Sequence, residues 1–417
     1  MLKNRNIFES NSVSDIKSKT SVTDKNIYSA ITPILYISKV IGIAPFDCTT
    51  GRATIGSSIY SLCIFFAILS WFIYDVLWNI WYNYPHISYT IIVPHIFKMT
   101  LSFSSVLITL LIFSTVHRNK FYAILSRISA IDAVLLNSKT LSNSMYRKTK
   151  IFLIVELLVV LPIYLILFFS ERIVWTGKLD NLNYLLEYFV HVIGTVMDLQ
   201  FIDLALLLKN RYCLVNKELL KLYNILSDEM EWTLIEIKSK HIVSVNPPRH
   251  VDQYPCGNFN PRCTGLNTKN NTDSYITQTV TQNEKILKLK KVHSCLYETA
   301  HYINSCYCLP ILLELTFIFG SVIQSLYNSV IVSMKLENLN TYGNDTEVVI
   351  LCIGWALVRL TRMVCTTTSC QLASNEANRT GILVHKLMLD NGDESKCLKD
   401  FSQQLLHYKL QFTHCYG

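Results

Sequence analysis

Ionisable and polar side chains lie inside long apolar runs of this chain, and they are the residues best suited to do chemistry. An ionisable group in a membrane interior is costly unless it has a partner or a function, so each one is a candidate site residue. One set combines charged groups with aromatic rings, which suits a binding site for a small molecule. Its members are Asp75, Trp78, His95, Lys98, Tyr188, His191, Gln324 and Trp355.

Spacing supports this first set. Asp75 and Trp78 are three residues apart, as are His95 and Lys98, so each pair shares one face of a helix. Asp75 and Lys98 fall at a similar depth in two neighbouring apolar runs, where they can pair. The pattern predicts ligand contact, and ordinary packing of polar stripes inside a helical bundle is the alternative interpretation.

A second set holds carboxylates and guanidinium groups in three later apolar runs. Opposite charges at matching depth predict pairs between helices, which would hold a bundle together. This set consists of Asp198, Asp203, Glu314, Arg359 and Arg362.

The sequence does not favour an enzyme. It contains no phosphate-binding loop, nucleophile elbow or paired-carboxylate motif, so we expect no catalysis and no cofactor. The thirteen cysteines have no regular spacing, so we expect reduced thiols and no metal site.

The elements that must position these residues are membrane helices. Half of the residues are hydrophobic and only 16% are charged. The apolar residues gather in runs near the ~20 residues that a helix needs to cross a bilayer. We therefore predict an all-α, polytopic membrane helical bundle embedded in a lipid bilayer. The predicted spans are 59–81, 89–116, 151–170, 185–208, 309–334 and 348–370.

Lysine and arginine are concentrated in alternate connecting segments, which predicts a cytoplasmic N-terminus by the positive-inside rule. The net charge of +8 is thus interpreted as loop charge, with no nucleic-acid partner. Asn344 heads a glycosylation sequon on a predicted outer loop. The predicted order is a cytoplasmic segment, four helices, a cytoplasmic loop with helical extensions and a flexible linker, two helices, and a cytoplasmic tail, over residues 1–56, 57–208, 209–306, 307–370 and 371–417.

Two motifs at the ends of the chain carry a family resemblance. The tail FSQQLLHYKLQFTHCYG, from Phe401 to Gly417, resembles the segment before the last helix of insect gustatory receptors. Near the other end, the spacing of Pro33, Tyr36 and Ser38 with Gly42 and the following Ala-Pro-Phe is similar to the entry segment of the same family, close to its broadly tuned and fructose-type members.

The resemblance implies a seven-helix subunit of a ligand-gated cation channel in the plasma membrane of chemosensory neurons. It implies a small-molecule tastant, a sugar or a bitter compound, and assembly as a homo- or hetero-tetramer with other gustatory receptor subunits. The family's last helix lines the pore, and the sequence stops at Gly417 before that helix, so we expect six of seven helices and a truncated chain.

Two other classes of membrane protein remain as alternatives. A G-protein-coupled receptor would place its N-terminus outside the cell, against the charge pattern. A secondary transporter is expected to show repeated halves or paired broken helices, for which the sequence gives no support.

Overall fold

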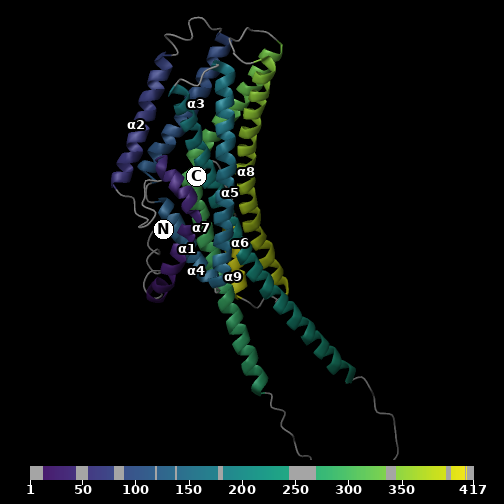
Figure 1. The fold of residues 1–417 in the computed structure, drawn as a ribbon. Helices are drawn as coiled ribbons and strands as arrows, with labels where there is room; N and C mark the ends of the chain where they lie inside the picture. The colour runs from purple at the N-terminus through teal and green to yellow at the C-terminus, as the bar shows by residue number, and fades with distance from the viewer. Residues whose placement is uncertain are drawn as a thin grey trace, which may run out of the picture. The chain divides into compact units, whose positions relative to one another are not determined.

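The described part of the chain folds into helices only. A computed structural model describes residues 13–43, 55–78, 89–117, 120–136, 139–176, 182–243, 269–334, 344–390, 396–408 and 410. Figure 1 shows these segments as helices without a strand among them, which confirms the predicted all-α class. The helices are α1 (Val13–Val40), α2 (Ile55–Trp78), α3 (Tyr89–Ser114), α4 (Lys120–Leu135), α5 (Lys139–Thr176), α6 (Leu182–Val243), α7 (Lys269–Ser333), α8 (Asp345–Asp390) and α9 (Lys396–His407).

Six of the described helices, α2, α3, α5, α6, α7 and α8, are long and apolar enough to cross a membrane, as the sequence predicted. Many side chains on α2 and α5 are apolar and exposed, as expected of helix faces that contact lipid acyl chains. Helices α6 and α7 extend well beyond their predicted spans, because α6 continues to Val243 and α7 begins at Lys269.

Three helices were not predicted from hydropathy: α1, α4 and α9. Their apolar residues recur at helical spacing without forming a continuous run of span length. In α1 the side chains of Ile27, Ile31 and Ile34 are almost fully buried at steps of four and three residues. Helix α1 packs against α4 and α5, so its apolar face is covered by protein.

The end of α1 explains part of the N-terminal motif. Gly42 has a φ of +83°, and the Ile43 N–H donates to the Ser38 carbonyl at 2.9 Å, a Schellman cap that favours glycine. The Ser38 hydroxyl accepts a hydrogen bond from Gln200 on α6, and the Tyr307 hydroxyl on α7 donates to Gln200 at 3.1 Å. The motif therefore ties α1 to the buried faces of α6 and α7. The Ala-Pro-Phe part of the motif and most of the tail after Tyr408 lie outside the described residues.

One cysteine differs from the expectation of reduced thiols. Cys308 on α7 is disulfide-bonded. The other described cysteines are free: Cys63, Cys213, Cys295, Cys306, Cys352, Cys365, Cys370 and Cys397. Disulfide formation depends on two cysteines meeting in space, which spacing along the chain does not reveal.

The chain divides into two compact units. The first contains residues 1–211, 295–375 and 410–417, and the second contains residues 212–294 and 376–409. Within the second unit, the Asn216 side chain on α6 donates to Glu376 on α8 and accepts from the Thr380 hydroxyl. The residues considered below as a site all belong to the first unit.

Candidate functional site

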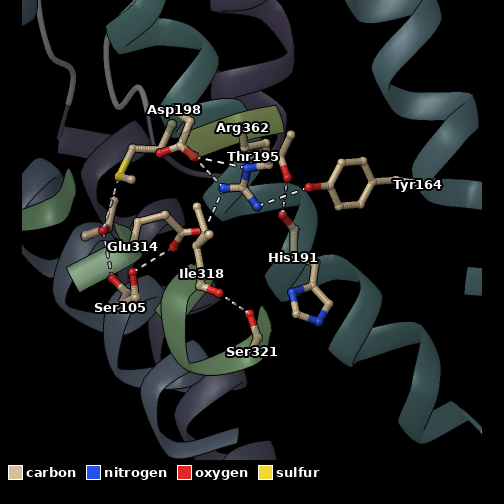
Figure 2. A network of polar contacts seen from close by, with 11 residues as sticks. Ser105, Tyr164, His191, Thr195, Asp198, Glu314, Ile318, Ser321 and Arg362 are labelled. Atoms are coloured by element: carbon tan, nitrogen blue, oxygen red, sulfur yellow. Dashed lines mark hydrogen bonds and ion pairs between the residues drawn. The ribbon is translucent and has the colours of Figure 1, made fainter. Parts of the chain in front are cut away.

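Arg362 on α8 is the centre of a buried polar network (Figure 2). Its Nη2 donates to Asp198 Oδ2 on α6 and to Glu314 Oε1 on α7, both at 2.6 Å. Its Nε also donates to Asp198 at 3.1 Å, and its Nη1 donates to the Tyr164 hydroxyl on α5 at 3.1 Å. One side chain thus connects four helices, and it does so with charge-assisted hydrogen bonds.

Glu314 extends the network to α3 and lies against α6. Its Oε2 accepts a hydrogen bond from the Ser105 hydroxyl at 2.9 Å (Figure 2). Gly194 makes the approach to α6 possible, because a Cβ atom there would lie 2.8 Å from Glu314 Oε1. Glycine at this point therefore allows a carboxylate to pack closely on a helix backbone.

Arg359 lies one turn before Arg362 on α8 and has different surroundings. Its Nη1 donates to the Ser325 hydroxyl at 3.0 Å and to the Ser321 carbonyl at 3.4 Å. Its guanidinium carbon lies 4.9 Å from the centre of the Trp355 ring and 6.0 Å from that of Phe317. Arg359 is only 4% exposed, and no described carboxylate lies within ion-pair distance of it.

Aromatic rings and an ion pair complete the cluster around Arg359. The His191 ring stacks on Phe317 at 5.5 Å and lies 5.9 Å from Trp355. Glu187, four residues earlier on α6, lies 3.9 Å from His191 Nε2 and 3.4 Å from Lys98 Nζ on α3. We call Lys98, Glu187, His191, Phe317, Trp355 and Arg359 the aromatic cluster. It offers rings, one ion pair and a guanidinium, which suits binding rather than bond-breaking chemistry.

The residues predicted to contact a ligand fall in several places. Lys98, His191 and Trp355 belong to the aromatic cluster. Tyr188 packs against the apolar core that includes Trp355, and its ring lies tilted against Phe168 at 4.8 Å. Gln324 on α7 has a buried side-chain oxygen with no hydrogen-bond partner among the described residues.

The remaining predicted ligand contacts lie on α2 and α3. Asp75 on α2 is half-buried, and Trp78 stacks on Tyr74 at 5.9 Å. His95 lies on α3, but its side chain falls outside the described residues.

The residues predicted to form charge pairs also separate. Asp198, Glu314 and Arg362 meet in the network, whereas Arg359 belongs to the aromatic cluster. Asp203 lies within electrostatic range of Glu156, and its Oδ2 is buried without a hydrogen-bond partner in the described chain.

The predicted glycosylation residue, Asn344, is exposed at the start of α8. Its N–H donates to the Glu347 carboxylate at 3.2 Å, and the Glu347 N–H donates to its carbonyl at 2.9 Å. This reciprocal arrangement is typical of a helix cap. It leaves the position at the surface, where a modifying enzyme could reach it.

Four members of these arrangements were not among the predicted residues: Ser105, Tyr164, Glu187 and Phe317. Glu187 could have been found, because it lies four residues before His191 on the same helical face. Ser105 and Tyr164 lie in strongly apolar runs and gave no signal of their own. Among the described residues, no three His, Cys, Asp or Glu side chains gather as metal ligands.

Comparison with known proteins adds one match. The family model of the 7tm chemosensory receptors matches residues 31–416, which is nearly the whole chain. A search of curated proteins finds no match. The matched region includes every helix that contributes to the network and to the aromatic cluster.

Proposed function

Because this chain belongs to the 7tm chemosensory receptor family, we propose that it is a gustatory receptor subunit that detects a small-molecule tastant. In this proposal the subunit resides in the plasma membrane of a chemosensory neuron and forms a ligand-gated cation channel as a homo- or hetero-tetramer. The family match carries the proposal. The six apolar helices and the polar groups buried among them support it.

The ligand would bind at the aromatic cluster, with Tyr188, Gln324, Asp75, Trp78 and His95 as further candidate contacts. Lys98 on α3 and Glu187 on α6 form an ion pair there, so a polar ligand that inserts between them would change how α3 and α6 meet. Trp355, Arg359 and Arg362 follow one another on α8, so α8 connects the cluster to the network.

Gating would follow from differential affinity. A ligand shifts a conformational equilibrium only by binding one state more tightly than the other. The network ties α8 to α5, α6 and α7 through one guanidinium, and to α3 through Glu314. A displacement of α8 at the cluster must therefore either move these helices together or break buried hydrogen bonds. We propose that this coupling transmits ligand binding through the bundle.

Lys98→Met tests the ligand site. The change removes the charge that pairs with Glu187, so we expect loss of the tastant response or at least a tenfold rise in the effective concentration. The measurement is a dose–response curve of cation flux in cells that express the chain with candidate partner subunits, alongside tastant-dependent melting of the purified chain. The tastant panel covers sugars and bitter compounds.

Lys221→Met is the matched control, because Lys221 is exposed and its ion pair within the described chain is with Glu218 on its own helix. Surface labelling must show equal delivery of both variants. An unchanged dose–response for Lys98→Met would exclude this site, whereas a chain that binds no tastant and supports no flux with any partner would contradict the receptor function itself.

A further inference from the structure

Arg359 differs from Arg211 and Arg362, two buried arginines of the first unit that form ion pairs with described carboxylates. Arg211 binds both oxygens of Asp132, at 2.7 and 3.0 Å, and Arg362 binds Asp198 and Glu314. Arg359 is equally enclosed, yet its hydrogen bonds go to a serine hydroxyl and a backbone carbonyl. A buried charge without a paired counter-charge is unfavourable and calls for a reason.

The guanidinium of Arg359 has donors to spare. A guanidinium carries five N–H groups in a rigid fork, and both described hydrogen bonds of Arg359 leave from Nη1. Nε and Nη2 therefore retain donors in the fork geometry that binds a carboxylate through two parallel hydrogen bonds. The contacts with Trp355 and Phe317 favour the cation but accept none of these hydrogen bonds.

Resting on the proposed receptor function, we propose that the ligand is a small organic acid whose carboxylate binds Arg359 and whose flat apolar part packs against the rings of Trp355, Phe317 and His191. The His191 ring lies within 6 Å of both the Phe317 ring and the Trp355 ring, so one planar group can contact more than one of the three. Rings of this kind favour stacked or edge-on contact with a planar partner. This combination distinguishes an aromatic acid from a sugar, which lacks both the charge and the flat apolar surface.

Two carboxylates on neighbouring helices oppose an anionic ligand. Glu187 is neutralised by Lys98 at 3.4 Å. Glu171 on α5 lies within electrostatic range of Arg359, Lys98 and Glu187, but it forms no ion pair with a described residue. It therefore competes with a ligand carboxylate for Arg359. Removing its charge should strengthen binding of an acid, while removing that of Arg359 should weaken it.

The test compares acids with their uncharged amides on the purified full chain in lipid nanodiscs. The probes are phenylacetate with phenylacetamide and indole-3-acetate with indole-3-acetamide, titrated by their effect on the melting temperature. We expect at least one acid to bind tenfold or more tightly than its amide. Arg359→Gln should weaken that acid by about tenfold to a hundredfold and bring acid and amide within about threefold, since a charge-assisted hydrogen bond is lost.

Two further variants keep the test decisive. Arg359→Lys preserves the charge without the fork and should lose about tenfold in acid affinity. Glu171→Gln leaves Arg359 in place and should raise acid affinity at least threefold, which tests the proposal even if Arg359→Gln does not fold. Equal binding of acid and amide by the natural chain, an acid preference that survives Arg359→Gln, or no rise with Glu171→Gln overturns the proposal.

Sucrose, fructose and caffeine are titrated in the same way, to distinguish failure of the acid proposal from failure of the proposed receptor function. A chain that binds one of these neutral compounds but none of the acids loses the acid proposal and keeps the receptor function. A chain that binds neither acids nor neutral compounds contradicts both.

Discussion

Arg359 and Arg362 lie one turn apart on the same helix, and both are buried, but they have opposite surroundings. Arg362 is held by two carboxylates and a tyrosine hydroxyl from three other helices. Arg359 is held by serine oxygens and aromatic rings. The same residue type on the same helix is thus used once as a tie between helices and once as a cation with donors in reserve. The difference shows that two buried charges of the same type on one helix can have quite different partners.

The charge balance sharpens this comparison. Arg362 supplies one positive charge to two carboxylates, so the network carries an excess of acceptors. Arg359 has no described carboxylate at ion-pair distance, although Glu171 lies within electrostatic range, so its guanidinium keeps N–H donors without a carboxylate acceptor. In our proposal, a ligand carboxylate would add a partner at Arg359 while the hydrogen bonds of Arg362 keep α8 connected to three other helices.

The largest expected effect comes from Arg362→Met. The change leaves Asp198 and Glu314 buried without their cation, and breaking a buried ion pair by removing one partner costs about 3–5 kcal/mol. The measurement is thermal unfolding of the purified chain in detergent or nanodiscs. Arg359→Met is the matched comparison, and we expect it to lower the stability by less than half as much. Equal losses for the two variants would erase the distinction between these arginines.

A triple variant shows whether the loss arises from carboxylates left without their cation. Adding Asp198→Asn and Glu314→Gln to Arg362→Met removes both charges that lack a partner, so much of the lost stability should return. No recovery would mean that Arg362 stabilises the bundle through packing of its side chain rather than through charge.

Gly194→Ala should have the next largest effect, because it tests how rigidly the network holds Glu314. The new Cβ would lie 2.8 Å from a carboxylate oxygen that Arg362 and Ser105 fix in place. Overpacking of this kind typically costs about 1–3 kcal/mol. Gly381→Ala, in the interior of α8, is the control. Nothing lies within 4 Å of its added Cβ, and alanine has a higher helix propensity than glycine. Unfolding temperatures of the two variants should move in opposite directions.

Much of the bundle could be predicted from the sequence, because a long apolar run predicts a membrane helix. The six spans followed from that rule. Helices α1, α4 and α9 did not, because each buries apolar side chains within the protein without a continuous apolar run of span length. Buried charges were equally visible as unusual residues in such runs. Their partners were not, since the partner of a charge depends on how helices rotate against one another.

Arg359 illustrates what the sequence could not provide. Its depth along the helix grouped it with the carboxylates of the second predicted set, but its guanidinium lies against the Trp355 ring. Long side chains on a helix point toward its N-terminus, so a residue covers the turn before its own Cα. Arg359 therefore reaches the turn that carries Trp355, in the aromatic cluster. Arg362, one turn later on α8, reaches the network.

The smallest expected effect is a change in the pH dependence of stability, and it comes from His117, just after α3. Unlike Arg359, this buried base can lose its proton near neutral pH. Arg359 keeps its charge because a guanidinium does not deprotonate at physiological pH. Burial and the nearby charge of Lys120 lower the pKa of His117 to about 4, although a backbone hydrogen bond to Cys306 acts in the opposite direction. The unfolded chain, with an ordinary pKa of 6.5, then binds more protons than the folded chain between these two values.

Stability should therefore fall as the pH decreases from about 6.5 toward 4, by about 1–2 kcal/mol from this group alone. The measurement is the unfolding temperature at pH 7.5 and pH 5 for the natural chain, for His117→Asn and for the control His385→Gln, whose histidine is exposed on α8. His117→Asn should reduce the pH dependence, while the control should leave it unchanged. If His117→Asn retains the full acid sensitivity, the protons are taken up elsewhere, and the buried carboxylates that Arg362 does not neutralise become the groups to substitute next.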